Sequence, residues 1–223
     1  ADDFKRAQPR ARLHRAAGKM KILLFGGTFD PPHKGHMNNL QAAMDCVQPD
    51  KVIVMPAGIP PHKKASTTDA ALRLAMCACF TALSPKVEVS DWEVRQGGRN
   101  YSVNTVEMLH SRYPADSLYM CVGSDMLLSF TRWYRWQDIL RMTALVVESR
   151  EVGDAAALHA AAEDLRRQGA TVLLAQAQAF PCASSDIRSG RVPRSRWEEV
   201  LPPNVIQIVK DNGLYTCNAD ING

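Results

Sequence analysis

The residues in this sequence best suited to chemistry lie in a glycine-rich turn that carries two histidines, His33 and His36. If a helix begins here, residues three apart lie on one face of its first turn. Gly26 and Gly27 let backbone amides approach an anion, and Gly35 removes a side chain that would keep a ligand off the helix. Imidazoles at a helix N-terminus suit a polyphosphate, whose charge would favour their protonation and make them hydrogen-bond donors. The turn therefore predicts a polyphosphate site.

Other phosphate-binding and metal-binding patterns fit this turn less well. The P-loop pattern G-x-x-x-x-G-K-[ST] is absent, and the dinucleotide pattern G-x-G-x-x-G does not follow the first expected strand. Hydride transfer by a nicotinamide cofactor therefore lacks support. A His-x-x-His pair could hold zinc, although the i, i+4 spacing with an intervening Glu is missing. That zinc site and two unrelated histidines stay open as alternatives.

A second segment, 182–188, combines hydroxyl side chains with an arginine. Ser184 and Ser185 stand where a helix could begin, and Arg188 follows one turn later. This arrangement suits the terminal phosphates of a nucleoside triphosphate, because a guanidinium binds phosphate oxygens through two parallel hydrogen bonds. Taken alone, the segment is equally typical of an ordinary helix cap.

Together, the two segments resemble the signatures of the nucleotidyltransferase superfamily. The first resembles its H-x-G-H motif, and the second resembles Ile-Ser-Ser-Thr-x-Ile-Arg, from which Ala183 and Ser185 depart. The effect of these departures is left open. The fold of the superfamily is akin to the catalytic core of class I aminoacyl-tRNA synthetases. The resemblance implies that His33, His36 and Arg188 are the catalytic residues.

Further segments resemble bacterial nicotinate-mononucleotide adenylyltransferases, and this similarity runs from Met20 to Tyr215. The segments are 58–63, 101–105, 123–127 and 133–136. The resemblance implies transfer of AMP from ATP to nicotinate mononucleotide, giving nicotinate adenine dinucleotide and pyrophosphate in NAD biosynthesis. It also implies Mg²⁺ as cofactor, held mainly by the ATP phosphates and by no protein metal site. An enzyme that uses nicotinamide mononucleotide and a non-catalytic nucleotide sensor on the same fold remain the alternatives.

The resemblance also implies two sets of binding residues. The ATP-binding set is Gly26, Gly27, Gly35, Gly123, Asp125, Ser184 and Ser185. The mononucleotide-binding set is Thr28, Phe29, His62, Lys63, Tyr101, Ser102 and Trp133. In the second set, His62 and Lys63 would face the phosphate and Trp133 would stack on the pyridine ring. Backbone amides near Tyr101 and Ser102 would receive the carboxylate.

Without the resemblance, two members of the mononucleotide set have simpler interpretations. The basic turn at 62–64 would be a solvated loop. Trp133 and Trp136 stand at helical spacing, where aromatic residues are more often packing residues than a shelf for a ligand.

These residues need a scaffold, and short apolar runs alternate with helical patterns along the chain. The expected strands are 21–25, 52–55, 87–89, 118–122, 144–147 and 171–174. The expected helices are 35–47, one starting near 68, 103–112, 155–168, one near 187, and 204–211. This alternation is typical of an α/β fold with a doubly wound, Rossmann-like parallel sheet and helices on both faces. We expect a single domain with a helical C-terminal part, which binds its ligand at the carboxyl ends of the strands.

The net charge of +4 belongs to one end of the chain. Residues 1–19 hold six Lys and Arg side chains and two Asp, so residues 20–223 carry no net charge. The sequence predicts a mobile basic extension at 1–19, a nucleotidyltransferase domain at 20–217 and a tail at 218–223. A basic arm that binds an acidic partner is the less favoured interpretation of the extension.

Composition excludes several classes of protein. The six cysteines show no zinc spacing and no C-x-x-C pair, and the sequence has no apolar run long enough for a membrane span. These features are typical of a reduced, cytoplasmic protein without a membrane partner. Because the body has no basic excess, we expect no nucleic acid as partner. A homo-oligomer is compatible with the sequence.

Overall fold

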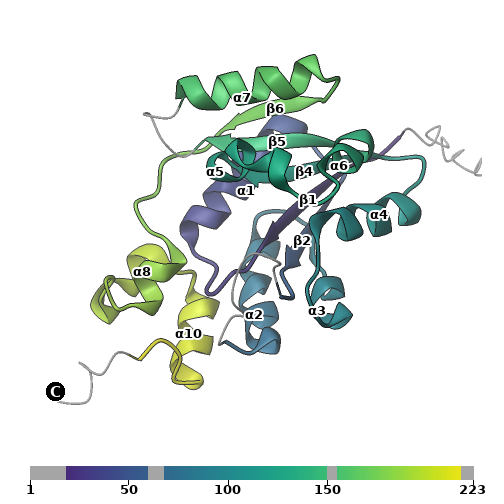
Figure 1. Ribbon diagram of the computed structural model, residues 1–223. Coiled ribbons are helices and arrows are strands. Elements are labelled where there is room, and N and C mark those ends of the chain that lie inside the picture. The colour runs from purple at the N-terminus through teal and green to yellow at the C-terminus, as the bar shows by residue number, and fades with distance from the viewer. Residues whose placement is uncertain (1–18, 60–67, 150–154, 217–223) are drawn as a thin grey trace, which may run out of the picture.

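The computed structural model describes residues 19–59, 68–149 and 155–216, and its centre is a six-stranded sheet (Figure 1). Neighbouring strands run parallel, in the order β3-β2-β1-β4-β5-β6. The strands are β1 (Lys21–Gly27), β2 (Lys51–Pro56), β3 (Val87–Val89), β4 (Ser117–Gly123), β5 (Thr143–Ser149) and β6 (Val172–Gln176). The expected doubly wound parallel sheet is confirmed.

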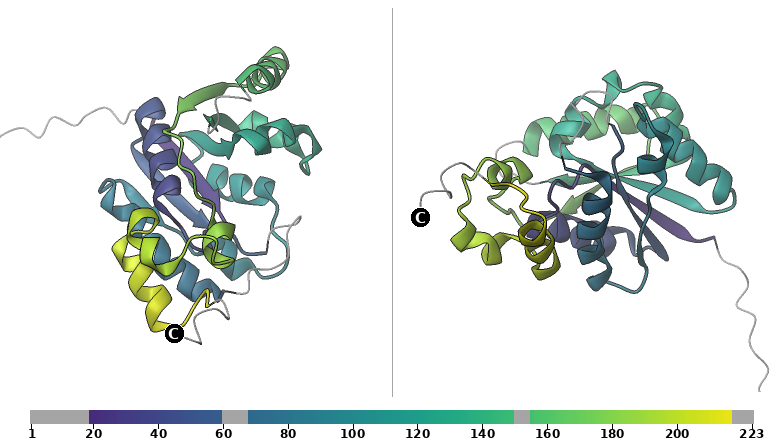
Figure 2. Two further views of the ribbon diagram at one scale, coloured as in Figure 1. Left: turned by 90° about the vertical axis from the view of Figure 1, so that its left-hand side faces the viewer. Right: turned by 90° about the horizontal axis from the view of Figure 1, so that it is seen from below.

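Two hydrophobic cores, one on each face, hold helices against the sheet (Figures 1 and 2). One core includes α1 (Lys34–Val47), α2 (Ala70–Met76), the 3₁₀ helix η1 (Cys77–Ala82), α8 (Ser184–Arg188), α9 (Trp197–Val200) and α10 (Pro203–Asp211). The other includes α3 (Trp92–Gln96), α4 (Ser102–Arg112), α5 (Ser124–Leu128), the 3₁₀ helix η2 (Phe130–Arg132), α6 (Trp136–Met142) and α7 (Ala155–Arg167). A short 3₁₀ helix, η3 (Arg194–Arg196), precedes α9.

Strand β1 shows why the apolar runs form a sheet that is buried on both faces. Successive side chains of a strand point to opposite faces. Ile22 and Leu24 therefore lie in one core, whereas Leu23 and Phe25 lie in the other. Ile22 and Leu23 are fully buried, which explains the continuous run of apolar residues in the sequence.

The strand order reverses between β1 and β4. The chain first winds outward from β1 to β3, and then crosses to the other side of β1 to form β4. Because all strands are parallel, Gly27 and Gly123, which end these two strands, lie on the same edge of the sheet. Helices α1 and α5, which leave β1 and β4, pack on opposite faces, and doubly wound sheets bind ligands at such a point. The first histidine motif and the segment after Gly123 therefore flank the expected ligand position.

The C-terminal helices gather at one end of the molecule, beside α2 (Figure 2). Ile187 of α8, Trp197 of α9 and Val205 of α10 are buried in the same core as α1. The expected helical C-terminal part is confirmed, and it lies against the edge of the sheet where β1 ends (Figure 1).

Local contacts decide where two of the helices begin. Helix α2 begins at Ala70, two residues after the expected start near 68, since the Asp69 carboxylate accepts the Ala71 N–H at 2.8 Å. Trp133 and Trp136 do not share a helix. Trp133 follows η2 in extended conformation, and Arg135, in the left-handed region at φ 52°, starts a new helical direction.

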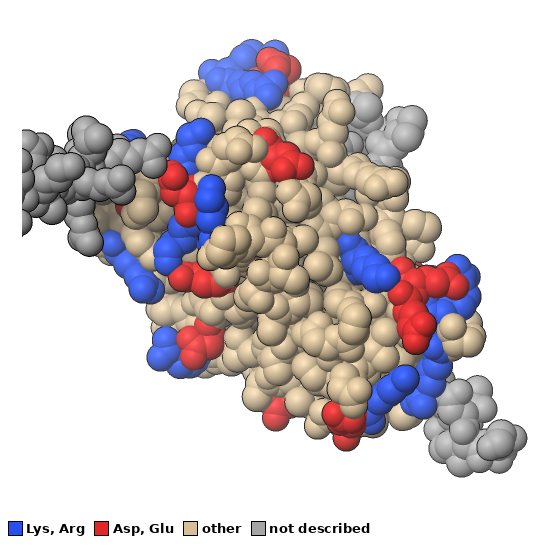
Figure 3. Space-filling view, turned by 180° about the vertical axis from the view of Figure 1, so that it is seen from behind, with Lys and Arg blue, Asp and Glu red and all other residues tan. Residues whose placement is uncertain are grey.

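Charged side chains on the face shown in Figure 3 alternate in sign around its edge, and much of its centre is uncharged. The described part of this face therefore lacks the continuous basic area typical of a nucleic-acid site. Among the helices of the described ranges, none is long and apolar enough to cross a membrane. The expected basic extension lies outside the described residues except for Lys19, and the tail at 218–223 lies outside them entirely.

Candidate active site

The turn after β1 is shaped by a buried aromatic ring. Phe29 is 2% exposed, stacks on Phe25 at 5.6 Å and packs at a tilt against Phe80 at 5.2 Å between ring centroids. Its backbone is left-handed at φ 51°, an uncommon conformation for a residue with a side chain. A Cβ atom on Gly27 would lie 2.8 Å from the Phe29 ring. Gly27 is therefore required for the ring to pack, and the packed ring sets the course of the turn.

The rings of the two histidines of the turn lie against each other, tilted by 30°, at the start of α1. His33 is the N-cap residue and His36 is the third residue of the helix, and their ring centroids are 3.8 Å apart. The His33 backbone N–H donates to His36 Nδ1 at 3.1 Å. A neutral His36 then carries its proton on Nε2 and presents it as a donor. In this tautomer His36 can donate to a phosphate oxygen while its Nδ1 still accepts from the His33 backbone.

Gly35 keeps this histidine pair in place. A Cβ atom at position 35 would lie 2.9 Å from Cε1 and Nδ1 of His33 and 2.9 Å from Cδ1 of Phe180. His33 is only 5% exposed, so its ring has little room to retreat. The function of this glycine is therefore to leave space for the His33 ring, in addition to the expected access for a ligand.

The second motif is bonded directly to the first. Ser184 Oγ donates to the backbone oxygen of Pro31 at 2.8 Å, and Arg188 Nη1 donates to the backbone oxygen of Asp30 at 2.6 Å. These contacts join residues 153 and 158 positions apart. The structure thus brings His33, His36 and Arg188 to one place, at the carboxyl end of β1.

Ala183 and Ser185 depart from the usual second motif without disturbing the start of α8. Ala183 is the N-cap residue, and its backbone N–H donates to Asp186 Oδ2 at 2.9 Å. The carboxylate of Asp186 thus binds an otherwise orphaned N–H at the helix start. Ser185 is exposed, so its hydroxyl faces away from the core.

Asp125 occupies the neighbouring strand end. Gly123 ends β4, and Asp125 is exposed in the first turn of α5. A Cβ atom on Gly123 would lie 3.0 Å from Asp125 Oδ1, so the glycine gives this carboxylate room. Asp125 lies across the reversal point of the strand order from the histidine turn.

A group of aromatic side chains lies on the opposite face of the sheet from the histidines. Tyr101 is the N-cap residue of α4, and its ring lies 4.9 Å from the ring of Tyr134. Trp133 is half-buried and its ring lies 5.0 Å from the ring of Phe130, which is fully buried. The segment 133–134 therefore lies beside the start of α4, which carries Tyr101 and Ser102, and together these residues form an aromatic surface.

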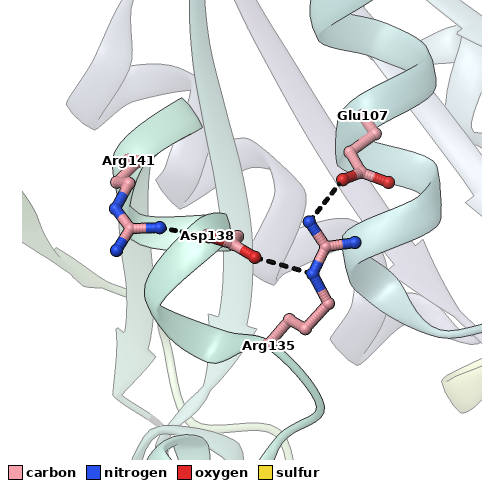
Figure 4. Close-up of polar contacts among 4 residues, drawn as sticks. All are labelled: Glu107, Arg135, Asp138 and Arg141. Atoms are coloured by element: carbon pink, nitrogen blue, oxygen red, sulfur yellow. Dashed lines mark hydrogen bonds and ion pairs between the residues drawn. The ribbon is translucent and has the colours of Figure 1, made fainter.

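Ion pairs hold the two segments of this aromatic surface together (Figure 4). Arg135 donates through Nη2 to Glu107 of α4 at 2.8 Å and through Nε to Asp138 of α6 at 2.6 Å. Asp138 also pairs with Arg141 of its own helix. Arg135 and Glu107 are 41% and 42% exposed, so these contacts face solvent.

Sequence reasoning missed a buried arginine that joins the ends of β1 and β2. Arg73 is 3% exposed, and its Nη1 donates to the backbone oxygens of Thr28 and Ala57, both at 2.8 Å. The signal was available, since Arg73 stands alone among the apolar residues of α2. A buried guanidinium needs hydrogen-bond acceptors, and here backbone oxygens supply them.

A buried polar network under α4 was also missed. Thr105 Oγ1 donates to Glu93 Oε1 at 2.6 Å, and Asn100 Nδ2 donates to Thr105 Oγ1 at 3.0 Å. Burial raises the pKa of Glu93, while hydrogen bonds from Thr105, Asn100 and the Gly58 backbone act in the opposite direction. The network supports the helix whose N-terminus carries Tyr101 and Ser102.

Two expected site residues, His62 and Lys63, lie outside the described residues, in the segment 60–67. Within the described ranges, no group of three or more His, Cys, Asp or Glu side chains is arranged to hold a metal ion.

Comparison with known proteins identifies proteins that are similar to this chain. Residues 24–190 match the family model described as cytidylyltransferase-like. A protein of Neisseria meningitidis named as a probable nicotinate-nucleotide adenylyltransferase is 34% identical over 201 residues, which cover 87% of this chain and 98% of the relative. A protein of Acidithiobacillus ferrooxidans with the same name is 34% identical over 207 residues, covering 87% of this chain and 95% of the relative.

Solved structures share the fold. The nicotinic acid mononucleotide adenylyltransferase of Plasmodium falciparum, complexed with NaAD, superposes with a TM-score of 0.70 at 16% identity. The alignment covers 88% of this chain and 97% of that one. The same protein complexed with APC gives a TM-score of 0.68.

Proposed function

The chain belongs to the cytidylyltransferase-like family, and we propose that the site formed by His33, His36 and Arg188 transfers AMP from ATP to nicotinate mononucleotide. The products are nicotinate adenine dinucleotide and pyrophosphate, so the enzyme is a nicotinate-nucleotide adenylyltransferase of NAD biosynthesis. One observation carries the assignment of the site. The second motif donates hydrogen bonds to the turn that precedes the histidines, at the carboxyl end of β1.

The reaction needs no nucleophile from the protein. A phosphate oxygen of the mononucleotide attacks the α-phosphorus of ATP in line, the bond to the β-phosphate breaks, and pyrophosphate leaves with its electron pair. A phosphate monoester is already ionised near neutral pH, so no general base is required. Catalysis then depends on orientation and on donors placed where negative charge develops. His36 donates through Nε2, His33 lies beside it, and Arg188 binds the departing phosphates.

Mg²⁺ fits this site as a partner of the substrate. The donors that converge on the turn are imidazoles and a guanidinium, which attract phosphates and not a bare cation. Mg²⁺ commonly stays hydrated and binds through substrate phosphates. Held in this way by ATP, it would neutralise charge on the leaving pyrophosphate.

Two nearby surfaces complete the ATP site. Backbone amides at Gly26, Gly27 and Gly35 give the triphosphate close approach, and Ser184 and Ser185 add hydroxyls at the start of α8. Asp125, just past Gly123, binds the ribose hydroxyls of the adenosine.

The mononucleotide lies between the histidine turn and the aromatic surface. Trp133 stacks on the pyridine ring, and backbone amides at Tyr101 and Ser102 receive the carboxylate at the N-terminus of α4, where a helix favours negative charge. His62, Lys63 and Thr28 bind its phosphate. The Phe29 ring lies in the core, so Phe29 contributes only through its backbone.

Purified protein tests the proposal with ATP, Mg²⁺ and each mononucleotide in turn. We expect release of pyrophosphate and a kcat/KM for nicotinate mononucleotide well above that for nicotinamide mononucleotide. Equal values would contradict selection of the acid. Binding of ATP without release of pyrophosphate with either mononucleotide would instead identify a nucleotide sensor.

A further inference from the structure

The chain after α10 turns back toward the histidine turn. Gly213 takes the left-handed conformation at φ 58°, and its N–H donates to the Lys210 oxygen at 3.3 Å. The Leu214 N–H donates to the Val209 oxygen at 3.0 Å. This C-terminal cap reverses the chain, so that Leu214 and Tyr215 pack against the core that includes α1 and α10.

Tyr215 reaches a residue of the first motif. Its hydroxyl donates to Asp30 Oδ1 at 2.6 Å, across a separation of 185 positions. Asp30 is only 4% exposed, so its carboxylate depends on protein donors. Burial raises the pKa of Tyr215 above its usual value, and the hydrogen bond to Asp30 raises it further, while Thr68 and Arg188 act in the opposite direction. The phenol therefore stays protonated and able to donate throughout the neutral range.

Asp30 connects this phenol to the phosphate-binding arginine. Its carboxylate accepts from Tyr215, and its backbone oxygen accepts from Arg188 Nη1 at 2.6 Å. The next residue, Pro31, accepts from Ser184 through its backbone oxygen. A shift of Asp30 would move the acceptor that orients Arg188. Tyr215 thus acts on the site through Asp30 without lying in it.

We propose that Tyr215 is a positioning residue for AMP transfer: its hydroxyl fixes Asp30, and Asp30 orients the Arg188 guanidinium toward the ATP phosphates. This inference rests on the proposed function, because its effect is measured as a change in the kinetics and affinity for ATP. It adds a residue outside both motifs to the machinery that holds the triphosphate.

The test is removal of one oxygen atom. Tyr215→Phe keeps the ring and leaves Asp30 Oδ1 without this donor, so we expect kcat/KM for ATP to fall about 10-fold, the size typical of a lost hydrogen bond to a charged group. KM for nicotinate mononucleotide should stay within about twofold of wild type, since both contacts lie on the ATP side. Tyr119→Phe in β4 is the matched control, and it should change neither value.

A double-mutant cycle separates positioning from general loss of structure. If Tyr215 acts through Arg188, its hydroxyl should contribute little to kcat/KM for ATP once the Arg188 guanidinium has been removed. Tyr215→Phe should then cost less than about twofold in an Arg188→Ala background and still cost about 10-fold in an Arg135→Ala background. A similar loss in both backgrounds, or no loss in the wild-type background, would overturn the proposal.

A second measurement tests the role of Tyr215 without any mononucleotide, so it does not depend on which substrate receives AMP. Affinity for MgATP, measured by calorimetry without a mononucleotide, should fall in Tyr215→Phe and show the same dependence on Arg188. A protein that binds MgATP in this pattern and transfers AMP to neither mononucleotide would refute the proposed function and support the positioning role. If Tyr215→Phe does not fold, Asp30→Asn takes its place in the cycle, and full additivity with Arg188→Ala would overturn the proposal.

Discussion

The two halves of the site are held together by different kinds of contact. On the side proposed to bind the ATP phosphates, Ser184 and Arg188 donate to backbone oxygens of the histidine turn, and His33 is 5% exposed. On the side proposed to bind the pyridine ring, Arg135 joins α4 and α6 through ion pairs, and the side chains of Arg135 and Glu107 are 41% and 42% exposed (Figure 4). The first half is fixed by contacts to backbone, and the second by long side chains in solvent.

This difference follows from what each half must do. Donors that stabilise developing charge are effective only when they are already in place, because reorganisation would consume the stabilisation they provide. Binding of the pyridine ring tolerates small adjustments of the protein. Exposed ion pairs are therefore sufficient there, although each contributes little and weakens with salt. We therefore expect substitutions on the phosphate side to reduce turnover, and those on the pyridine side to change KM for the mononucleotide.

His36→Ala tests the comparison with the largest expected effect. Loss of the Nε2 donor should lower kcat about 10²–10³-fold, as removal of one charge-stabilising donor does in other enzymes. Steady-state kinetics under saturating ATP measures it, with His159→Ala, an exposed histidine of α7, as the control. Turnover near that of wild type would remove His36 from the mechanism.

Gly35→Ala tests how tightly the phosphate side is packed. The added Cβ would lie 2.9 Å from the His33 ring and from Phe180, so the ring must shift. We expect kcat to fall about 10-fold and the free energy of unfolding to fall by about 1–3 kcal/mol, the usual cost of overpacking. Kinetics together with urea denaturation measures both. Unchanged kcat would show that the histidine pair tolerates displacement, which would contradict a rigid phosphate side.

Arg135→Ala tests the pyridine side and should have a smaller effect. Without the bridge between α4 and α6, KM for the mononucleotide should rise about two- to five-fold, with kcat nearly unchanged, because exposed ion pairs are weak. High salt weakens the ion pair in wild type, so the difference in KM between wild type and Arg135→Ala should shrink as salt is added. Arg141→Ala is the matched control, since it breaks an ion pair of the same Asp138 within one helix. An equal rise in both variants would exclude a specific role for the bridge.

Glu93→Gln tests the buried network beneath the pyridine side, with the smallest effect on activity. Burial raises the pKa of Glu93 above its ordinary value of 4.5. A carboxyl whose pKa is raised in the folded state stabilises that state at low pH, and this contribution is lost as pH rises through the raised value. The stability of wild type relative to Glu93→Gln should therefore decline from pH 4.5 upward, as followed by urea denaturation. A difference that does not vary with pH would contradict a titrating Glu93.

Much of the fold could be predicted from the sequence because the cores impose simple periodicities. β1 alternates its apolar side chains between two cores, and the resulting continuous run identified the strand. The starts of helices were harder to predict. The carboxylate of Asp69 sets the start of α2, and the left-handed Arg135 sets the start of α6.

The site likewise contains residues that the sequence predicts and residues that it does not. The histidine turn and the segment 182–188 carry recognisable residue types, and the structure brings them into contact. The lone Arg73 of α2 marked a buried cation, but its partners and those of Tyr215 could not be predicted, because they are backbone oxygens and one buried carboxylate far away in the chain. Contacts of this kind leave no local pattern. They follow only from the path of the folded chain.

The distance of 158 positions between Asp30 and Arg188 has a consequence for synthesis of the protein. At the usual pace of translation, the ribosome needs about 8–30 s to pass from one residue to the other. During that interval the nascent chain already carries the histidine turn but lacks the guanidinium that completes it. A chain interrupted before α8 would therefore hold half of the phosphate site, and competence for AMP transfer arises only near the end of translation.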